Sequence, residues 1–189
     1  MDSYLDALRA DGPAADRANA MDLYGWLIGD WALEVSEFLA DNTTLTRPGE
    51  WHFGWVLEGR AIQDVWIVPP RGQRRPEAAV AGSERYGTTL RVYDPGIDAW
   101  HILWTEPVTQ LYLRQIGRRQ GAGIVQDGRL PDGQLMRWSF SDIAAHSFVW
   151  RSQVSADEGT NWRMNVEFLA RRMNGGAAQS TARVRPIAF

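Results

Sequence analysis

Large apolar side chains recur at every second position in several stretches of this chain, and many of them are tryptophan. The alternating sets are Trp51, Phe53, Trp55 and Leu57, then Trp100, Ile102 and Trp104, then Trp162, Met164, Val166 and Phe168. Residues two positions apart lie on the same face of a β-strand. Strands that each carry one large apolar face have to cover it, usually in a sandwich or a closed barrel. The pattern therefore predicts an all-β fold.

The composition excludes several classes of chemistry and of partner. The chain has 189 residues and a formal net charge of -3, which predicts one domain and gives no electrostatic reason to bind nucleic acid or an anionic membrane. All 20 basic residues are arginine, so Schiff-base chemistry on a lysine side chain is excluded. The absence of cysteine excludes disulfides, thiolate nucleophiles and cysteine-bound metals.

The N-terminal residues do not resemble a targeting sequence. Residues 1–6 are acidic and lack the apolar segment of a signal peptide. No stretch of the sequence approaches the roughly 20 apolar residues that a membrane-spanning helix needs. We therefore expect a cytoplasmic protein of bacterial type, with no membrane partner.

The sequence divides into three parts by its periodicity. Residues 1–29 carry apolar side chains at helical spacing, interrupted at Gly12-Pro13 and ended by a glycine, which predicts short helices. Residues 30–172 follow the period of a β-strand instead. Residues 173–189 begin with a stretch rich in glycine, alanine and serine, which predicts a C-terminal tail.

About ten strands are predicted within residues 30–172. They cover residues 31–36, 51–57, 61–68, 86–93, 99–105, 109–116, 123–126, 134–140, 147–154 and 162–171. Short turns, such as residues 94–98 and 131–133, join most of them, while residues 71–85 are predicted to form one long solvated loop. Because closure removes exposed strand edges, we predict an antiparallel up-and-down β-barrel of about 8–10 strands.

Residues 27–31 read Leu-Ile-Gly-Asp-Trp, which resembles the Gly-x-Trp signature of the calycin superfamily, the group that contains lipocalins and fatty-acid-binding proteins. The resemblance implies that a short helix, here within residues 1–29, closes one end of the barrel. It implies that the tryptophan of the first strand packs across the barrel floor. It also implies that an arginine of the last strand covers this tryptophan, and Arg171 and Arg172 are both candidates.

A closer resemblance, over roughly residues 20–172, is to bacterial lipocalin-like proteins of the DUF1579 type. It is carried by the Gly-Asp-Trp segment, by the predicted hairpin at residues 57–60, by Tyr93-Asp94 before the turn that leads to Trp100, and by the closing strand that begins at Trp162. Members of that group mostly lack an assigned activity, so the resemblance adds to the fold prediction more than to the function.

Residues 155–162 resemble the Asp-box of sialidase-type propellers, Ser-x-Asp-x-Gly-x-Thr-Trp, and depart from it at Asn161. In an Asp-box the aspartate accepts hydrogen bonds from the amides of a hairpin turn, and the tryptophan packs beneath that turn. This chain contains one copy and is too short for a propeller. We therefore interpret the segment as a hairpin turn.

The three histidines, His52, His101 and His146, lie apart in the sequence and form no motif of closely spaced ligands. His52 and His101 alternate out of phase with neighbouring tryptophans, so we expect them to face solvent and predict no metal site. Nitrobindin-type calycins, which this chain resembles in length and tryptophan content, bind haem through a histidine late in the barrel. The last histidine here precedes the final two strands, so we expect no cofactor and keep haem as an alternative.

The aromatic strand faces predict a barrel that binds a small, flat, hydrophobic molecule in its interior. The predicted wall consists of Trp51, Phe53, Trp55, Trp66, Trp104, Tyr112 and Trp138. Arg91, Arg114 and Glu106 are the candidate polar anchors, because a buried charge needs a partner that a ligand can supply. A barrel filled solid by its own side chains would contradict this function, and a ligand-free homodimer would then be the remaining interpretation.

The alternative is an enzyme of the same fold, acting as a cyclase, isomerase or hydratase on a hydrophobic natural-product-like substrate. Aromatic walls preorganise such substrates and stabilise the cations that develop on them. The candidate acids and bases are Glu106, His146 and Glu167. The sequence shows neither a Gly-x-Ser-x-Gly nucleophile motif nor paired carboxylates, and it leaves the question of catalysis open.

Overall fold

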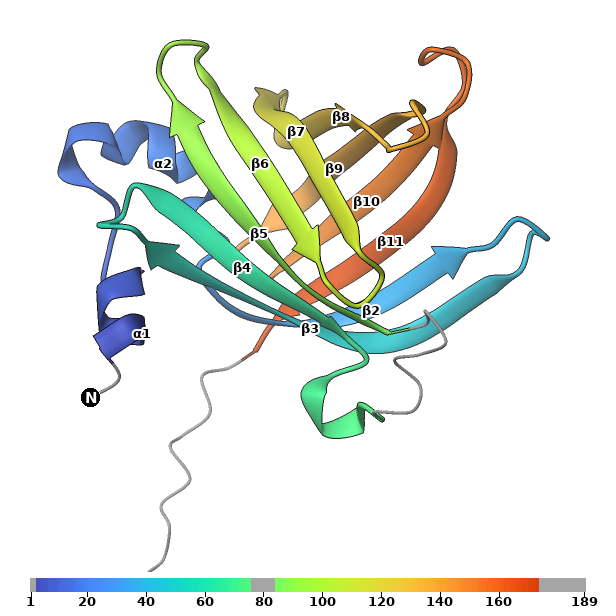
Figure 1. The fold of residues 1–189 in the computed structure, drawn as a ribbon, viewed down its shortest axis with the longest axis horizontal. Coiled ribbons are helices and arrows are strands. Elements are labelled where there is room, and N and C mark those ends of the chain that lie inside the picture. The colour runs from blue at the N-terminus through green and yellow to red at the C-terminus, as the bar shows by residue number, and fades with distance from the viewer. Residues whose placement is uncertain (1–2, 76–83, 174–189) are drawn as a thin grey trace, which may run out of the picture.

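The computed structural model describes residues 3–75 and 84–173, and it shows one closed antiparallel β-barrel (Figure 1). The ten barrel strands are β2 (Gly29–Phe38), β3 (Thr44–Val56), β4 (Ala61–Val68), β5 (Arg85–Asp94), β6 (Ala99–Glu106), β7 (Leu111–Gln120), β8 (Gly123–Arg129), β9 (Leu135–Ala144), β10 (Ser147–Ser155) and β11 (Arg163–Arg172). Each strand pairs with its neighbours in sequence, and β11 pairs with β2 to close the ring. The predicted all-β, up-and-down barrel is confirmed.

Short elements precede the barrel and follow β4. They are α1 (Ser3–Leu8), β1 (Arg9–Ala10), η1 (Ala15–Arg17), α2 (Ala18–Gly25) and η2 (Arg71–Gln73). The two-residue strand β1 was not predicted. It pairs with the end of β3, in the part of β3 that does not pair with β2. Of the predicted loop and tail, residues 76–83 and 174–189 lie outside the described residues. None of the described helices is long and apolar enough to cross a membrane.

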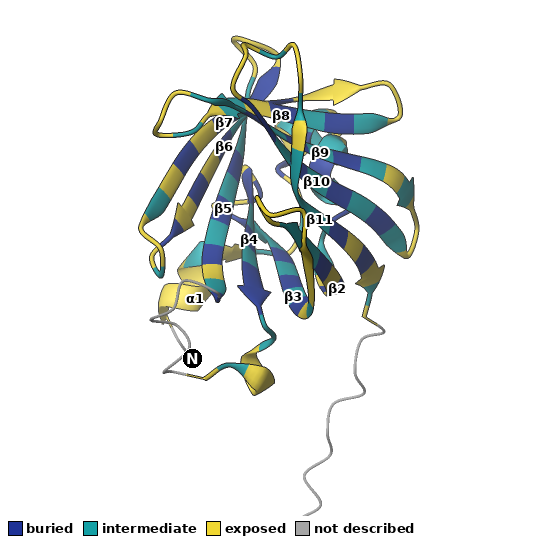
Figure 2. Cartoon of the chain, turned by 90° about the vertical axis from the view of Figure 1, so that its right-hand side faces the viewer, coloured by how far each residue is buried: buried dark blue, intermediate teal, exposed yellow. Residues whose placement is uncertain are grey.

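Side chains alternate between the interior and the outer face along the barrel strands, as the period of two predicts. On β2, Trp31, Leu33 and Val35 are buried, whereas Ala32 and Glu34 between them are exposed. Figure 2 shows the same banding of buried and exposed positions along many of the other strands. The buried apolar positions form one hydrophobic core inside the barrel.

Helix α2 covers one end of the barrel, which we call the closed end. Its Met21 and Tyr24, together with Leu27 just after it, are 0% exposed and belong to the barrel core. The ring of Tyr24 packs edge-on against Trp100, at the start of β6, with 4.9 Å between the ring centres. The short helix that the calycin resemblance implied is therefore an integral part of the core.

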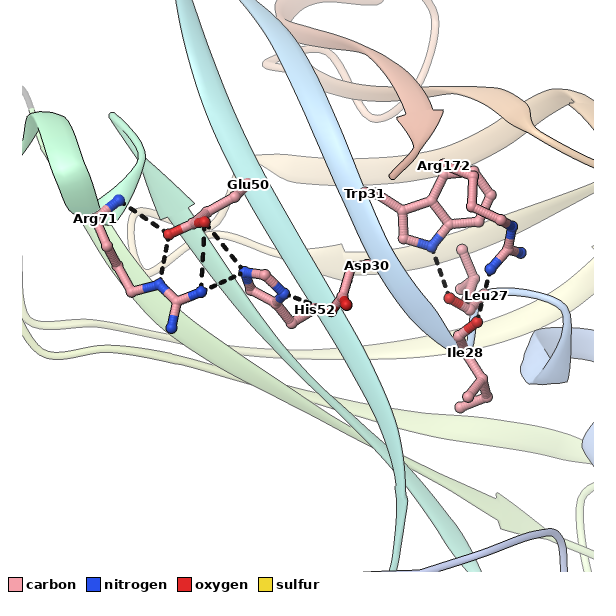
Figure 3. Close-up of polar contacts among 8 residues, drawn as sticks. All are labelled: Leu27, Ile28, Asp30, Trp31, Glu50, His52, Arg71 and Arg172. Atoms are coloured by element: carbon pink, nitrogen blue, oxygen red, sulfur yellow. Dashed lines mark hydrogen bonds and ion pairs between the residues drawn. The ribbon is translucent and has the colours of Figure 1, made fainter. Parts of the chain in front are cut away.

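Trp31 and Arg172 join the first and last barrel strands at the closed end (Figure 3). The register of β2 and β11 places the two residues opposite each other, and the Arg172 guanidinium lies 4.1 Å from the centre of the Trp31 ring. The indole N–H of Trp31 donates to the Leu27 carbonyl at 2.7 Å, and Arg172 donates to the Ile28 carbonyl at 2.8 Å. Of the two candidate arginines, Arg172 thus covers the tryptophan, while Arg171 is exposed.

The turn between β10 and β11 has the geometry that the Asp-box resemblance implied. The Asp157 carboxylate accepts hydrogen bonds from the backbone N–H of Asn161 at 2.8 Å, from the Asn161 side chain at 2.7 Å and from the Ser155 hydroxyl at 2.8 Å. These bonds lower the pKa of Asp157 to about 2. The indole N–H of Trp162 donates to the Gly159 carbonyl at 3.1 Å, so the segment is a hairpin turn, as interpreted.

Candidate functional site

Aromatic side chains fill much of the barrel interior. The ring centre of Trp51 lies 4.8 to 6.2 Å from the centres of six other rings, those of Phe53, Trp66, Phe140, Phe148, Trp150 and Phe168. Edge-to-face and offset contacts at these distances are typical of stable aromatic clusters. Over much of its length, the interior is therefore a packed core rather than an open chamber.

A cavity of about 120 Å³ remains at the end of the barrel opposite α2, and we call it the mouth cavity. Glu106, the last residue of β6, lines it, whereas Trp100 at the start of the same strand packs on α2. Its apolar lining consists of Trp66, Trp104, Leu111, Leu113, Leu130, Met136, Trp138, Trp150, Val154 and Val166. Its polar lining consists of Arg85, Glu106, Ser152 and Asn165. Four tryptophans thus surround a small space with a few polar groups.

Two of these four tryptophans carry unpaired hydrogen-bond donors. The indole nitrogens of Trp66 and Trp150 are buried and have no hydrogen-bond partner among the described residues. At the closed end, by contrast, the indole N–H groups of Trp26 and Trp31 donate to backbone carbonyls at 2.9 and 2.7 Å. Leaving a buried donor unpaired costs about 1–3 kcal/mol. An acceptor atom that reaches either N–H group would remove this cost, which a purely apolar ligand cannot do.

Glu106 lines the mouth cavity and is 0% exposed, but its carboxylate is engaged by the turn that follows β6. Its Oε1 accepts from the backbone N–H of Val108 at 2.9 Å, and its Oε2 accepts from the backbone N–H of Thr109 at 3.1 Å. The Thr109 hydroxyl also donates to Oε2. Both oxygens thus fix the β6–β7 turn, which favours a structural role for Glu106 over proton transfer.

Arg91 is inside the barrel, as predicted, but it lies toward the closed end. Its guanidinium is 0% exposed, forms an ion pair with Asp64 on β4, and lies 5.3 and 5.5 Å from the ring centres of Phe53 and Tyr24. Asp64 was not singled out from the sequence, although it alternates in phase with Trp66. Arg91 is therefore anchored by a carboxylate of the protein itself, and it does not line the mouth cavity.

Three of the predicted wall residues, Trp66, Trp104 and Trp138, line the mouth cavity. Trp51 and Phe53 are interior as predicted, but they belong to the packed core. Trp55 is half-buried beside Gly25 of α2, at the closed end. Sequence reasoning missed Trp150, which lines the cavity and alternates in phase with Phe148, an apolar pair that could have been recognised.

Tyr112 and Arg114 lie on the outer face of β7, so their prediction as interior residues is wrong. Tyr112 is 57% exposed and donates its hydroxyl proton to Gln110 at 2.8 Å, and Arg114 is exposed. Leu113 faces the interior instead, opposite Trp104 of β6 in the strand register. Since β7 carries apolar residues on both faces, its alternation alone did not distinguish inside from outside.

The three candidate acids and bases do not converge on one site. His146 is exposed in the turn between β9 and β10, and its carbonyl accepts from the backbone N–H of Arg172 at 2.9 Å at the closed end. Glu167 lies on the outer face of β11, where it forms an ion pair with Arg151 at 2.7 Å. Neither residue lines the mouth cavity beside Glu106. His146, the last histidine of the chain, does not line the mouth cavity, and haem binding stays an alternative prediction.

The other two histidines lie on the outer face, as expected from their alternation. His52 on β3 has its Nδ1 2.7 Å from the Asp30 carboxylate and its Nε2 3.3 Å from that of Glu50, which also pairs with Arg71 at 2.7 Å (Figure 3). His101 pairs with the carboxylate of Asp94 in the same way, at 3.0 Å. Within residues 3–75 and 84–173, no three or more His, Cys, Asp or Glu side chains gather in a group that could hold a metal ion.

Comparisons with known proteins reach the level of the fold. No family model matches the chain, and no curated protein matches it. Among solved structures, the crystal structure of Rv2717c from M. tuberculosis matches with a TM-score of 0.58 and 14% sequence identity, over 83% of this chain and 99% of that one. At this identity the likeness shows the fold alone. The closed antiparallel barrel and this structural neighbour fit a calycin- or lipocalin-like barrel.

Proposed function

We propose that this protein binds a small aromatic molecule, about the size of a single ring and carrying one hydrogen-bond acceptor, in the mouth cavity. The observation that carries the proposal is that Trp66 and Trp150, two of the residues that line this mainly apolar cavity, have buried indole N–H groups without a partner among the described residues. Trp104 and Trp138 complete the aromatic wall and supply faces for ring contacts. This ligand is a more specific case of the small, flat, hydrophobic molecule that the sequence predicts.

The volume of the mouth cavity limits the size of the ligand. Pockets for drug-sized ligands measure roughly 300–1,000 Å³, whereas an apolar cavity of about 150 Å³ is known to accept benzene. At about 120 Å³, the mouth cavity suits a single ring and not a fused polycyclic molecule. The packing of Trp51 and its neighbours below the cavity prevents a larger ligand from reaching deeper without moving those rings.

A matched pair of probes, benzaldehyde and toluene, tests the acceptor requirement, because the two differ little in size and only benzaldehyde has a carbonyl. The aldehyde cannot form a Schiff base with a side chain, since the protein has no lysine. We expect benzaldehyde to bind more tightly and to shift the indole N–H signals of Trp66 and Trp150 in a nuclear magnetic resonance titration. One hydrogen bond of about 1 kcal/mol corresponds to a difference of about fivefold.

The variant Trp66→Phe keeps an aromatic ring and removes one N–H donor. It should weaken benzaldehyde binding about fivefold and leave toluene binding nearly unchanged. The control is Trp162→Phe, because Trp162 lies in the β10–β11 turn and its N–H is already bonded to the Gly159 carbonyl. Equal losses in both variants, or equal affinity of the natural protein for both probes, would contradict the proposal.

A further inference from the structure

A second hollow lies at the closed end, on the opposite side of the packed core from the mouth cavity. This closed-end cleft has a volume of about 780 Å³ and is open to solvent. One wall is formed by η1 and α2, and the other by the β5–β6 hairpin and the end of β7. Its size lies within the range of roughly 300–1,000 Å³ that is common for small-molecule sites.

Positive charge gathers in the closed-end cleft, although the whole chain is acidic with a net charge of -3. Three arginines line it, Arg17, Arg118 and Arg119, against two aspartates, Asp16 and Asp98. Both aspartates are already engaged. Asp16 accepts from Arg60 at 3.0 Å, and Asp98 accepts from the hydroxyl of Tyr93 at 2.7 Å. Arg60 compensates the charge of Asp16, so three guanidinium groups stand against the one carboxylate of Asp98, and the balance of charge in the cleft is positive.

The guanidinium groups of the cleft have N–H donors that are not used within the described residues. The guanidinium groups of Arg118 and Arg119 make no hydrogen bond or ion pair in the described part of the chain, and both residues are exposed. The guanidinium of Arg17 forms a long contact of 3.5 Å with the carboxylate of Asp16. Its Nε is buried and has no hydrogen-bond partner among the residues that the structure describes. A guanidinium offers several N–H donors in a planar array that matches the oxygens of phosphate groups.

The part of the cleft formed by the β5–β6 hairpin is suited to a ring. Tyr93 is half-buried there, with its ring centre 5.8 Å from that of Trp100 on the cleft floor. The hydrogen bond to Asp98 fixes the phenol at its far end. Pro95, in the turn after Tyr93, adds a rigid apolar surface. The cleft thus places a flat aromatic surface beside three arginines.

We propose that the closed-end cleft binds a phosphate monoester of an aromatic compound, with the phosphate held by Arg17, Arg118 and Arg119 and the ring against Tyr93. Phosphate is favoured over carboxylate because three guanidinium groups match a dianion with three acceptor oxygens better than a monoanion with two. This site is separate from the mouth cavity and does not depend on the function proposed for it.

Calorimetric titration of the full chain with phenyl phosphate tests the proposal. We expect phenyl phosphate to bind more tightly than phenol, inorganic phosphate or benzoate, with an affinity that falls as salt is added. The double variant Arg118→Gln/Arg119→Gln should weaken binding about tenfold or more, since charge-assisted hydrogen bonds are the strong ones. The control Arg114→Gln/Arg171→Gln changes the net charge equally on exposed barrel positions and should change the affinity by less than about twofold.

The inference would be overturned by no saturable binding of phenyl phosphate by the natural protein, by equal losses in the two double variants, or by benzoate binding as tightly as phenyl phosphate. Near-ultraviolet circular dichroism of both double variants establishes that the aromatic core is intact. Trp66→Phe separates the two sites, because it should leave phenyl phosphate binding unchanged. A parallel loss in that variant would place the ring in the mouth cavity and would also overturn the inference.

Discussion

Tyr24 is the residue that links helix, core and polar interior at the closed end. Its hydroxyl oxygen accepts a hydrogen bond from the side-chain amide of Gln126 at 2.9 Å, and its ring lies under the guanidinium of Arg91. Burial raises the pKa of Tyr24 to about 12, although the nearby positive charge of Arg91 and the hydrogen bond from Gln126 oppose the shift. The neutral phenol is thus strongly preferred in the folded state.

Tyr24 therefore makes stability depend on pH in the alkaline range. Its pKa is higher in the folded state, about 12, than the ordinary value of 10.0 in the unfolded state. The stabilisation that it contributes is fully present below pH 10 and is lost as the pH rises through 12. Among the five tyrosines, we expect one to ionise last in an ultraviolet titration, and Tyr24→Phe should remove that step. A late step that persists in Tyr24→Phe would contradict the assignment.

At the scale of single residues, alternation predicted the interior wherever one strand face was clearly more apolar. Trp66, Trp104 and Trp138 were placed correctly for this reason. The same reasoning was wrong for Tyr112 and Arg114, because β7 carries apolar residues on both faces and polar residues on both faces as well. There, the side that faces inward is decided by the register with β6, where Leu113 lies opposite Trp104, and register is a tertiary property.

At the scale of elements, the barrel closes at the junction of β2 and β11, which we call the seam, and Arg172 stabilises this junction. It donates to the carbonyls of Trp26 and Ile28, before β2, and to that of Ala145, in the turn before β10, at 2.7, 2.8 and 3.2 Å. The sequence located an arginine at the end of the last strand but left Arg171 and Arg172 equivalent. Only the pairing of β11 with β2 decides between them, because it fixes which of the two faces the barrel floor.

Replacing Arg172 with methionine should destabilise the closed seam. The variant keeps an unbranched apolar chain over Trp31 but leaves three backbone carbonyl groups without their donor. We therefore expect a loss of about 2–4 kcal/mol in the free energy of unfolding. The exposed neighbour provides the control, and Arg171→Met should change stability by no more than about 0.5 kcal/mol. Urea denaturation measures both. Similar midpoints for the two variants would show that the contacts of Arg172 contribute little.

At the scale of the whole molecule, the protein is a barrel packed through its middle, with the mouth cavity at one end and the closed-end cleft at the other. The closed barrel could be predicted from the sequence, because period-two tryptophan faces and short turns leave few other ways to cover the apolar surface. The volume of the mouth cavity could not, since it depends on how Trp51 and its neighbours fill the space together. The closed-end cleft could not be predicted either, because it brings together η1, α2, the β5–β6 hairpin and β7.

The N-terminal elements should differ sharply in their contribution to the stability of the whole barrel. No residue of α1 is buried, and neither residue of β1 is fully buried, whereas Met21 and Tyr24 of α2 are 0% exposed. Burying a side chain of this kind contributes about 1.5–3 kcal/mol, so removal of α2 should cost about 3–6 kcal/mol of a total that is typically about 5–15 kcal/mol. It would also uncover Trp100, on which Tyr24 packs.

We therefore expect a chain lacking residues 1–10 to retain a single cooperative thermal transition, with a near-ultraviolet spectrum close to that of the full chain. A chain lacking residues 1–25 should lose the sharp transition and the near-ultraviolet signal of the tryptophan core while it keeps much of its β-sheet signal in the far ultraviolet. If the chain lacking residues 1–25 melted as cooperatively as the full chain, the barrel would be stable without α2, and this prediction would be wrong. In the full chain, we expect the near-ultraviolet and far-ultraviolet signals to be lost at the same temperature, because α2 and the barrel unfold as one unit.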